Sequence, residues 1–254
     1  YLGDGCEFIA DEPDGTNIND NCGSTHIGQL CEYVRNGGLN AGFAFDGDAD
    51  RCLAVDENGN VVDGDRIIAI LAKHMKHKGI LRGDAAVVTV MSNLGFHDVM
   101  KDNGIKTICA KVGDRYVLEE MLRSGYNIGG EQSGHIILLD HATTGDGQLT
   151  AAMLIKVMQE TGKPLSELCR DIVDYPQLLV NVRITESGKG RWNTVPAITD
   201  CIAAAESELS GNGRVLVRES GTEPLVRVMV EGKDMDMVRR LADSIADEVR
   251  NSLA

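Results

Sequence analysis

Three aspartates at alternate positions form the first candidate site in this chain. Asp46, Asp48 and Asp50 follow directly on the apolar run Phe43–Phe45, and Arg51 comes next. If the loop curls, the three carboxylates converge, and hard oxygen ligands of this kind suit Mg²⁺. An adjacent arginine can hold a phosphoryl oxygen through a forked pair of hydrogen bonds. The pattern therefore predicts a magnesium site, with Arg51 as a catalytic group in phosphoryl transfer.

Three other interpretations of this loop compete with a magnesium site. A calcium-binding EF-hand would use Glu57 as its twelfth residue, but Arg51 stands at the sixth position, where that loop needs a glycine. A phosphorylated nucleophile at Asp46 would explain neither the third aspartate nor the arginine. A solvated acidic turn is the simplest alternative, although three like charges so close together are costly without a cation.

A second polar loop contains Glu131, Ser133 and His135 within a glycine-rich stretch between two expected strands. The glycines allow close backbone approach, and the three side chains offer an acceptor, a hydroxyl and an imidazole. This mixture suits the hydroxyls of a sugar. A glycine-rich surface turn with a solvated glutamate would produce the same pattern.

A third polar loop joins two expected strands near the end of the chain. Backbone N–H groups around Ser220, Gly221 and Thr222 could enclose a phosphate together with the forked side chains of Arg218 and Arg227. An ordinary polar hairpin is the alternative here.

The elements that must position these loops alternate between short β-rich runs and amphipathic helical stretches, which is typical of βαβ units. The sequence predicts an α/β fold with a mixed, mostly parallel sheet and flanking helices. An antiparallel hairpin should follow Asp50, because Asn58-Gly59 favours a tight turn between two apolar runs. The expected strands are Cys6–Ala10, Ala41–Phe45, Ala85–Met91, Thr107–Ala110 and His135–Leu139.

The pattern changes near residue 175, where a long strand follows a helix-rich stretch. Beyond it we expect a small α+β C-terminal domain that ends in a helix with one apolar face. The expected division is residues 1–28 as the tail of a preceding domain and a linker, 29–174 as a metal- and sugar-binding α/β domain, and 175–254 as a phosphate-binding domain. The expected elements of the last part are Leu178–Ile184, Thr194–Leu209, Arg214–Arg218, Leu225–Glu231 and a final helix containing Val238, Leu241, Ala242, Ile245 and Val249.

The composition excludes some classes of partner. The chain has 39 acidic and 25 basic residues, a net charge of −14, which repels nucleic acid and anionic lipid surfaces. No apolar run approaches the ~20 residues of a membrane helix, so we expect no membrane association. Seven scattered cysteines, an odd number without a C-x-x-C pair, indicate reduced thiols in a cytoplasmic protein.

Taken together, the loops 46–51, 130–135 and 218–224 resemble, in order and spacing, three signature loops of the α-D-phosphohexomutase family. The resemblance implies that the first loop binds Mg²⁺, that the second contacts sugar hydroxyls, and that the third grips the distal phosphate of the substrate. It spans nearly the whole chain.

Two further stretches, Glu12–His26 and Leu139–Gly147, resemble the branch of the family that acts on phosphorylated amino sugars. This resemblance implies an enzyme that interconverts glucosamine 6-phosphate and glucosamine 1-phosphate through a phosphoserine and a bisphosphorylated sugar, feeding bacterial cell-wall precursor synthesis. Branches acting on glucose or mannose phosphates remain alternatives, as does a non-catalytic module that binds sugar phosphates.

The chain departs from the family in one respect, because the Ser-His-Asn-Pro type of motif that carries the nucleophilic serine does not occur in it. The resemblance therefore implies a C-terminal fragment with the third and fourth domains only. It would need the N-terminal domains of the same protein as partners and would have no mutase activity alone. A homodimer is also compatible with the sequence.

Overall fold

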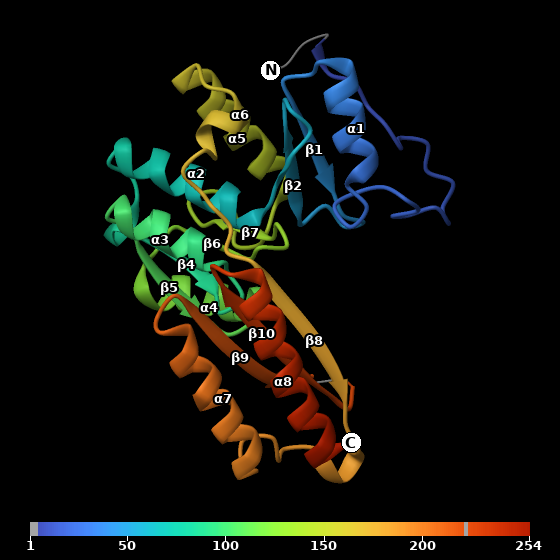
Figure 1. Ribbon diagram of the computed structural model, residues 1–254. Coiled ribbons are helices and arrows are strands. Elements are labelled where there is room, and N and C mark those ends of the chain that lie inside the picture. The colour runs from blue at the N-terminus through green and yellow to red at the C-terminus, as the bar shows by residue number, and fades with distance from the viewer. Residues whose placement is uncertain (1–4, 221–222) are drawn as a thin grey trace. The chain divides into compact units, whose positions relative to one another are not determined.

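The computed structural model describes residues 5–220 and 223–254 of the chain. The chain divides into two compact units, Tyr1–Val173 and Asp174–Ala254, and each is described by itself (Figure 1).

The first unit begins with an irregular segment, residues 5–27, followed by helix α1 (Gly28–Gly37) and an antiparallel sheet of β1 (Ala41–Phe45), β2 (Cys52–Asp56) and β3 (Val61–Val62). The hairpin predicted after Asp50 is confirmed. Its turn is held by Asp56, whose Oδ1 accepts from the N–H groups of Asn58 (2.9 Å) and Asn60 (2.8 Å). The strand predicted at Cys6–Ala10 is wrong, because those residues are mostly exposed and pair with no strand among the described residues.

A second sheet has the strand order β5-β4-β6-β7, in which β4 is parallel to β5 and β6, and β7 is antiparallel to β6. This confirms the mixed, mostly parallel sheet. The strands are β4 (Ala85–Thr89), β5 (Lys106–Ala110), β6 (Ile128–Gly130) and β7 (Ile136–Leu138). The helices are α2 (Gly64–His77), α3 (Leu94–Asp102), α4 (Asp114–Ser124), α5 (Gly147–Thr161) and α6 (Leu165–Leu168), with a 3₁₀ turn, η2 (Arg82–Asp84).

Helices cover both faces of this second sheet. All five residues of β4 are buried, as expected for a strand covered on both sides. Ala86 and Val88 belong to the core that includes residues of α2, α3 and α5. Val87 lies in a separate cluster with Val117 and Met121 of α4. This sheet and the helices on its two faces therefore form an α/β/α layer structure.

The second unit contains an antiparallel sheet with the order β8-β10-β9 and two long helices that pack on it. Its elements are β8 (Gln177–Arg183), η3 (Glu186–Gly188), α7 (Pro196–Leu209), β9 (Gly213–Glu219), β10 (Leu225–Gly232) and α8 (Met235–Leu253). The predicted apolar face of the last helix is confirmed, because Val238, Ile245 and Val249 are completely buried. This unit is the predicted α+β C-terminal part.

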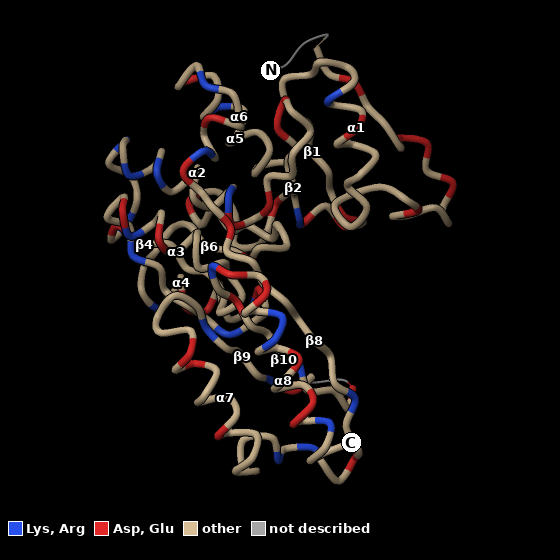
Figure 2. The backbone as a smooth tube through the Cα atoms, viewed as in Figure 1, with Lys and Arg blue, Asp and Glu red and all other residues tan. Residues whose placement is uncertain are grey.

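Acidic residues occur along the backbone of both units (Figure 2). Among the helices of residues 5–220 and 223–254, none is both long and apolar enough to cross a membrane.

Candidate functional site

The acidic loop connects β1 to β2, whose register pairs Phe45 with Cys52. Asp46, Asp48 and Asp50 each offer an oxygen, and these three oxygens lie within 4.8 Å of one another. Two hydrogen bonds to Asp46 curl the loop. The N–H of Ala49 donates to the Asp46 carbonyl (3.1 Å), and the N–H of Arg51 donates to Asp46 Oδ1 (3.1 Å). Ala49 adopts a left-handed backbone, φ 58°, which completes the turn.

The electrostatics of the loop favour a cation. Burial raises the pKa of the Asp50 carboxyl, and the neighbouring Asp46 carboxylate raises this pKa further. Oδ1 of Asp50 is buried and has no hydrogen-bond partner among the described residues. The Arg51 Nε lies 3.5 Å from Asp46 Oδ2, so only one of the three acids has a nearby cationic side chain on this loop. An all-oxygen donor set with a buried, unpartnered oxygen fits Mg²⁺.

His135 lies against the acidic loop. Its side chain is buried, and its Nε2 lies 3.5 Å from Asp50 Oδ2. The backbones also meet, because Arg51 and His135 form an isolated antiparallel bridge and the N–H of Cys52 donates to the carbonyl of Gly134 (3.0 Å). The structure thus brings the acidic loop and the Glu131–His135 loop together within the first unit.

The other two predicted sugar-binding residues differ in their surroundings. The carboxylate of Glu131 accepts from the N–H of Gly113 (2.9 Å), at the residue just before α4. Ser133 is exposed. Of the three side chains predicted for this loop, Ser133 is the most accessible to a ligand and His135 is the most enclosed.

The start of α5 packs behind the acidic loop. The N–H of Gly147 donates to the carbonyl of Ala49 (2.9 Å), and the N–H of Gly145 donates to His135 Nε2 (3.2 Å). These glycines were not expected as site residues from the sequence. The signal for them in the sequence is the resemblance of residues 139–147 to one branch of a family, which assigns them no role in the site.

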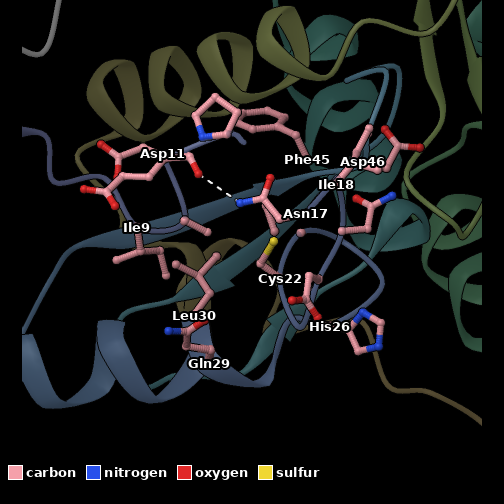
Figure 3. A pocket seen from close by; sticks show the side chains of 18 of the residues that line it. Ile9, Asp11, Asn17, Ile18, Cys22, His26, Gln29, Leu30, Phe45 and Asp46 are labelled. Carbon is pink, nitrogen blue, oxygen red and sulfur yellow. Dashed lines mark hydrogen bonds between the residues drawn. The ribbon is translucent and has the colours of Figure 1, made fainter. Parts of the chain in front are cut away.

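A pocket of about 910 Å³ opens beside the acidic loop (Figure 3). It is enclosed by the segment before α1, by α1 itself and by the end of β1, and Figure 3 shows Ile18 next to Asp46 at one end of it. The side chains of Ile18 and Asn19 pack closely on Gly47, because a Cβ added to Gly47 would lie only 2.7 and 3.1 Å from them. The sequence had not indicated that this segment reaches the acidic loop.

In the second unit, β9 and β10 present two arginines to one another. Arg218 and Arg227 are direct partners across the antiparallel ladder. Burial lowers the pKa of Arg218, and the adjacent Arg227 cation lowers this pKa further. The buried Nε of Arg227 has no hydrogen-bond partner among the described residues. Two like charges placed directly opposite one another destabilise a sheet, so this pair is suited to an anion.

The loop between these strands is only partly described. The N–H of Ser220 donates to the carbonyl of Leu225 (2.9 Å), which closes the hairpin. Gly221 and Thr222, which were predicted to help enclose a phosphate, lie outside the described residues. The two arginines and Ser220 thus remain as the described part of the predicted phosphate site.

Two family descriptions match the chain. Residues 63–175 match "Phosphoglucomutase/phosphomannomutase, alpha/beta/alpha domain III", and residues 179–248 match "Phosphoglucomutase/phosphomannomutase, C-terminal domain". The Glu131–His135 loop lies within the first match, and Arg218 and Arg227 lie within the second. The acidic loop lies upstream of both.

Curated relatives are similar over almost the whole chain. A protein named phosphoglucosamine mutase from Streptococcus agalactiae serotype Ia is 56% identical over 245 residues, covering 96% of this chain and 54% of that protein. The phosphoglucosamine mutase of Streptococcus pyogenes serotype M18 gives the same identity and coverage. The chain therefore spans about half the length of the curated relatives it matches.

Solved structures of lower identity share the fold. A crystal structure of Aspergillus fumigatus N-acetylphosphoglucosamine mutase, in complex with GlcNAc-6P and magnesium, matches with a TM-score of 0.71 at 22% identity, covering 91% of this chain and 53% of that one. A phosphoglucomutase/phosphomannomutase family protein from Burkholderia thailandensis matches with a TM-score of 0.70 at 20% identity, covering 90% and 50%.

Proposed function

Since the chain belongs to the phosphoglucomutase/phosphomannomutase family, we propose that it forms part of an enzyme that interconverts glucosamine 6-phosphate and glucosamine 1-phosphate. The choice of an amino sugar is supported by relatives named phosphoglucosamine mutase at 56% identity over 96% of the chain. In this proposal a phosphoserine donates its phosphoryl group, a bisphosphorylated sugar turns over, and the other phosphate returns to the serine.

The convergence of Asp46, Asp48 and Asp50 is the observation that carries the proposal. Their oxygens lie within 4.8 Å of one another, a spacing that a single divalent cation can span. When bound there, Mg²⁺ would neutralise charge on the transferring phosphoryl group and orient its oxygens. Arg51 lies at the edge of the cluster with its side chain 45% exposed, where its guanidinium can turn from Asp46 to a phosphoryl oxygen.

The two polar loops bind the rest of the substrate in this proposal. Ser133 and Glu131 contact sugar hydroxyls, and His135 lies where it can contact both the sugar and the acidic loop. In the second unit the opposed cations of Arg218 and Arg227 hold the distal phosphate with Ser220. Gly221 and Thr222 complete that loop. Residues 29–174 would then serve metal and sugar binding, and residues 175–254 phosphate binding.

In this proposal the partner of the chain is the part of the same protein that corresponds to the half of the relatives' length not covered here. No Ser-His-Asn-Pro motif occurs in the 254 residues, and in this proposal the nucleophilic serine comes from N-terminal domains of the same protein. We expect the chain alone to show no mutase activity and to gain it when the N-terminal domains are supplied.

Seven free cysteines support a cytoplasmic location. A homodimer stays a prediction.

Calorimetric titration of glucosamine 6-phosphate into the chain, with and without Mg²⁺, tests the proposal. We expect Mg²⁺ to strengthen binding, and Asp48→Asn to remove that effect because it neutralises one ligand. Asp243→Asn, an exposed change on α8, is the matched control and should bind like wild type. Glucose 6-phosphate and mannose 6-phosphate should bind more weakly. Identical affinities of the wild-type chain with and without Mg²⁺ would refute the assigned metal role.

A further inference from the structure

The start of α5 touches both the acidic loop and His135. The N–H of Gly147 donates to the carbonyl of Ala49 (2.9 Å), in the middle of the three aspartates. The N–H of Gly145 donates to His135 Nε2 (3.2 Å), and the same nitrogen lies 3.5 Å from Asp50 Oδ2. Two glycines at one helix start therefore contact two loops that lie about 85 positions apart in the chain.

No side chain fits at either glycine. A Cβ on Gly145 would lie 2.5 Å from the His135 ring and 2.6 Å from the carbonyl of Asp50. A Cβ on Gly147 would lie 2.7 Å from the carbonyl of Arg51 and 2.9 Å from that of Ala49. Neither glycine has a positive φ, so the neighbouring loop, and not the local backbone, requires glycine here. Glycine is needed at both positions because the acidic loop and His135 pack directly against them.

Asp146, between the two glycines, fixes where the helix begins. Its carboxylate accepts from the N–H of Leu149 (2.9 Å), which is an N-cap, and its carbonyl accepts from the buried hydroxyl of Thr150 (2.8 Å). Since Gly145 and Gly147 flank Asp146 directly, the cap determines the place of both N–H groups that reach the loops. Asp146 itself is no member of the acidic cluster.

We propose that Gly145, Asp146 and Gly147 are positioning residues that hold the acidic loop and His135 against each other, so that Asp50 keeps its place among the three aspartates. This inference rests on the proposed function, because the purpose of the held geometry is metal binding. The residues act through the loop and do not touch the ion or the substrate.

The cap gives a test without steric clash. Asp146→Ala removes the N-cap bond, and Asp146→Asn retains an oxygen that can accept it. Asp234→Ala is the matched control, because Asp234 caps α8 in the second unit by accepting from Asp236 and Met237 (2.9 and 3.1 Å). Each variant of the 254-residue chain is titrated with Mn²⁺, followed by electron paramagnetic resonance, and its amide hydrogen exchange is measured without metal.

We expect Asp146→Ala to weaken Mn²⁺ binding about threefold or more, in line with the loss of an N-cap, and to speed exchange at the amides of Ala49 and Arg51. Asp146→Asn should restore both values, and Asp234→Ala should lower thermal stability without changing either. The inference is wrong if Asp146→Ala behaves like wild type, if Asp146→Asn does not rescue it, or if Asp234→Ala has the same effect.

A second pair of variants tests the close packing. Gly147 and Gly28 are both the first residue of a helix, and a Cβ on Gly28 would meet nothing within 4 Å. Gly147→Ala should abolish Mn²⁺ binding in a chain whose circular dichroism spectrum stays like that of wild type, whereas the Gly28→Ala variant should bind Mn²⁺ normally. If the wild-type chain binds no Mn²⁺, the proposed function fails at its metal, and the exchange of the 46–51 amides still decides whether Asp146 holds the loop.

Discussion

Neutralising Arg218 should weaken phosphate binding and at the same time stabilise the free protein. Arg218 and Arg227 are direct partners across the ladder of β9 and β10, and the Nε of Arg227 is buried without a partner among the described residues. Arg218→Gln keeps most of the aliphatic stem and removes the charge. In the free protein it relieves a like-charge cross-strand pair, an effect of roughly 0.2–1 kcal/mol. For a unit of this size that corresponds to about 1–8 °C in Tm.

The same substitution removes a charge-assisted hydrogen bond to the anion. Such bonds contribute about 1.5–3 kcal/mol, so the Kd for glucosamine 6-phosphate should rise roughly 10- to 150-fold. Calorimetric titration gives the affinity, and differential scanning calorimetry gives the Tm of the ligand-free chain. Arg239→Gln, at an exposed position of α8, is the control and should change neither quantity appreciably.

The opposite signs of the two effects make the test specific. If Arg218 only packed against its neighbours, shortening its side chain would lower the stability of the protein and leave the affinity for glucosamine 6-phosphate almost unchanged. A decrease in Tm together with an unchanged Kd for Arg218→Gln would therefore refute an anion site between the two strands.

Three further predictions concern the acidic loop and the core of the second unit. The pKa of Asp50 is raised from 3.8, so the metal-free fold should gain stability as the pH falls through that raised pKa. Mg²⁺ binding should weaken over the same pH range, which lies above pH 3.8, because Asp50 takes up a proton there. A Mg²⁺ affinity that stays constant until the pH reaches 3.8 would contradict this. Mg²⁺ should raise the Tm of the wild-type chain but not that of Asp48→Asn, as thermal unfolding at increasing Mg²⁺ will show. Ile245→Ala in α8 removes a completely buried side chain and should cost about 2–5 kcal/mol in denaturant unfolding, and a loss below 1 kcal/mol would mean that the helix does not pack as described.

Local patterns in the sequence were sufficient for much of the fold. Strand β1, the hairpin after Asp50 and the apolar face of α8 follow from residue type and periodicity, and the structure confirms them. The convergence of the three aspartates also follows from local factors, because alternate positions on one short loop are close in space once two hydrogen bonds curl it.

The same kind of evidence failed where a strand needs a partner. Cys6–Ala10 has an apolar content compatible with a strand, but an extended segment becomes a strand only when another pairs with it. Among the described residues none does, and Phe8 remains 76% exposed. Pairing depends on segments distant in sequence, which periodicity alone does not reveal.

The sequence by itself determined which side chains this protein offers: three clustered acids, a glycine-rich polar loop and two arginines at the ends of neighbouring strands. Only the tertiary structure decided which of them meet. His135 lies against Asp50 and Gly147 donates to Ala49, because strand register and helix packing bring together positions that no local pattern links. Residue types follow from the order of the chain, whereas contacts follow from how its distant segments bury their apolar faces.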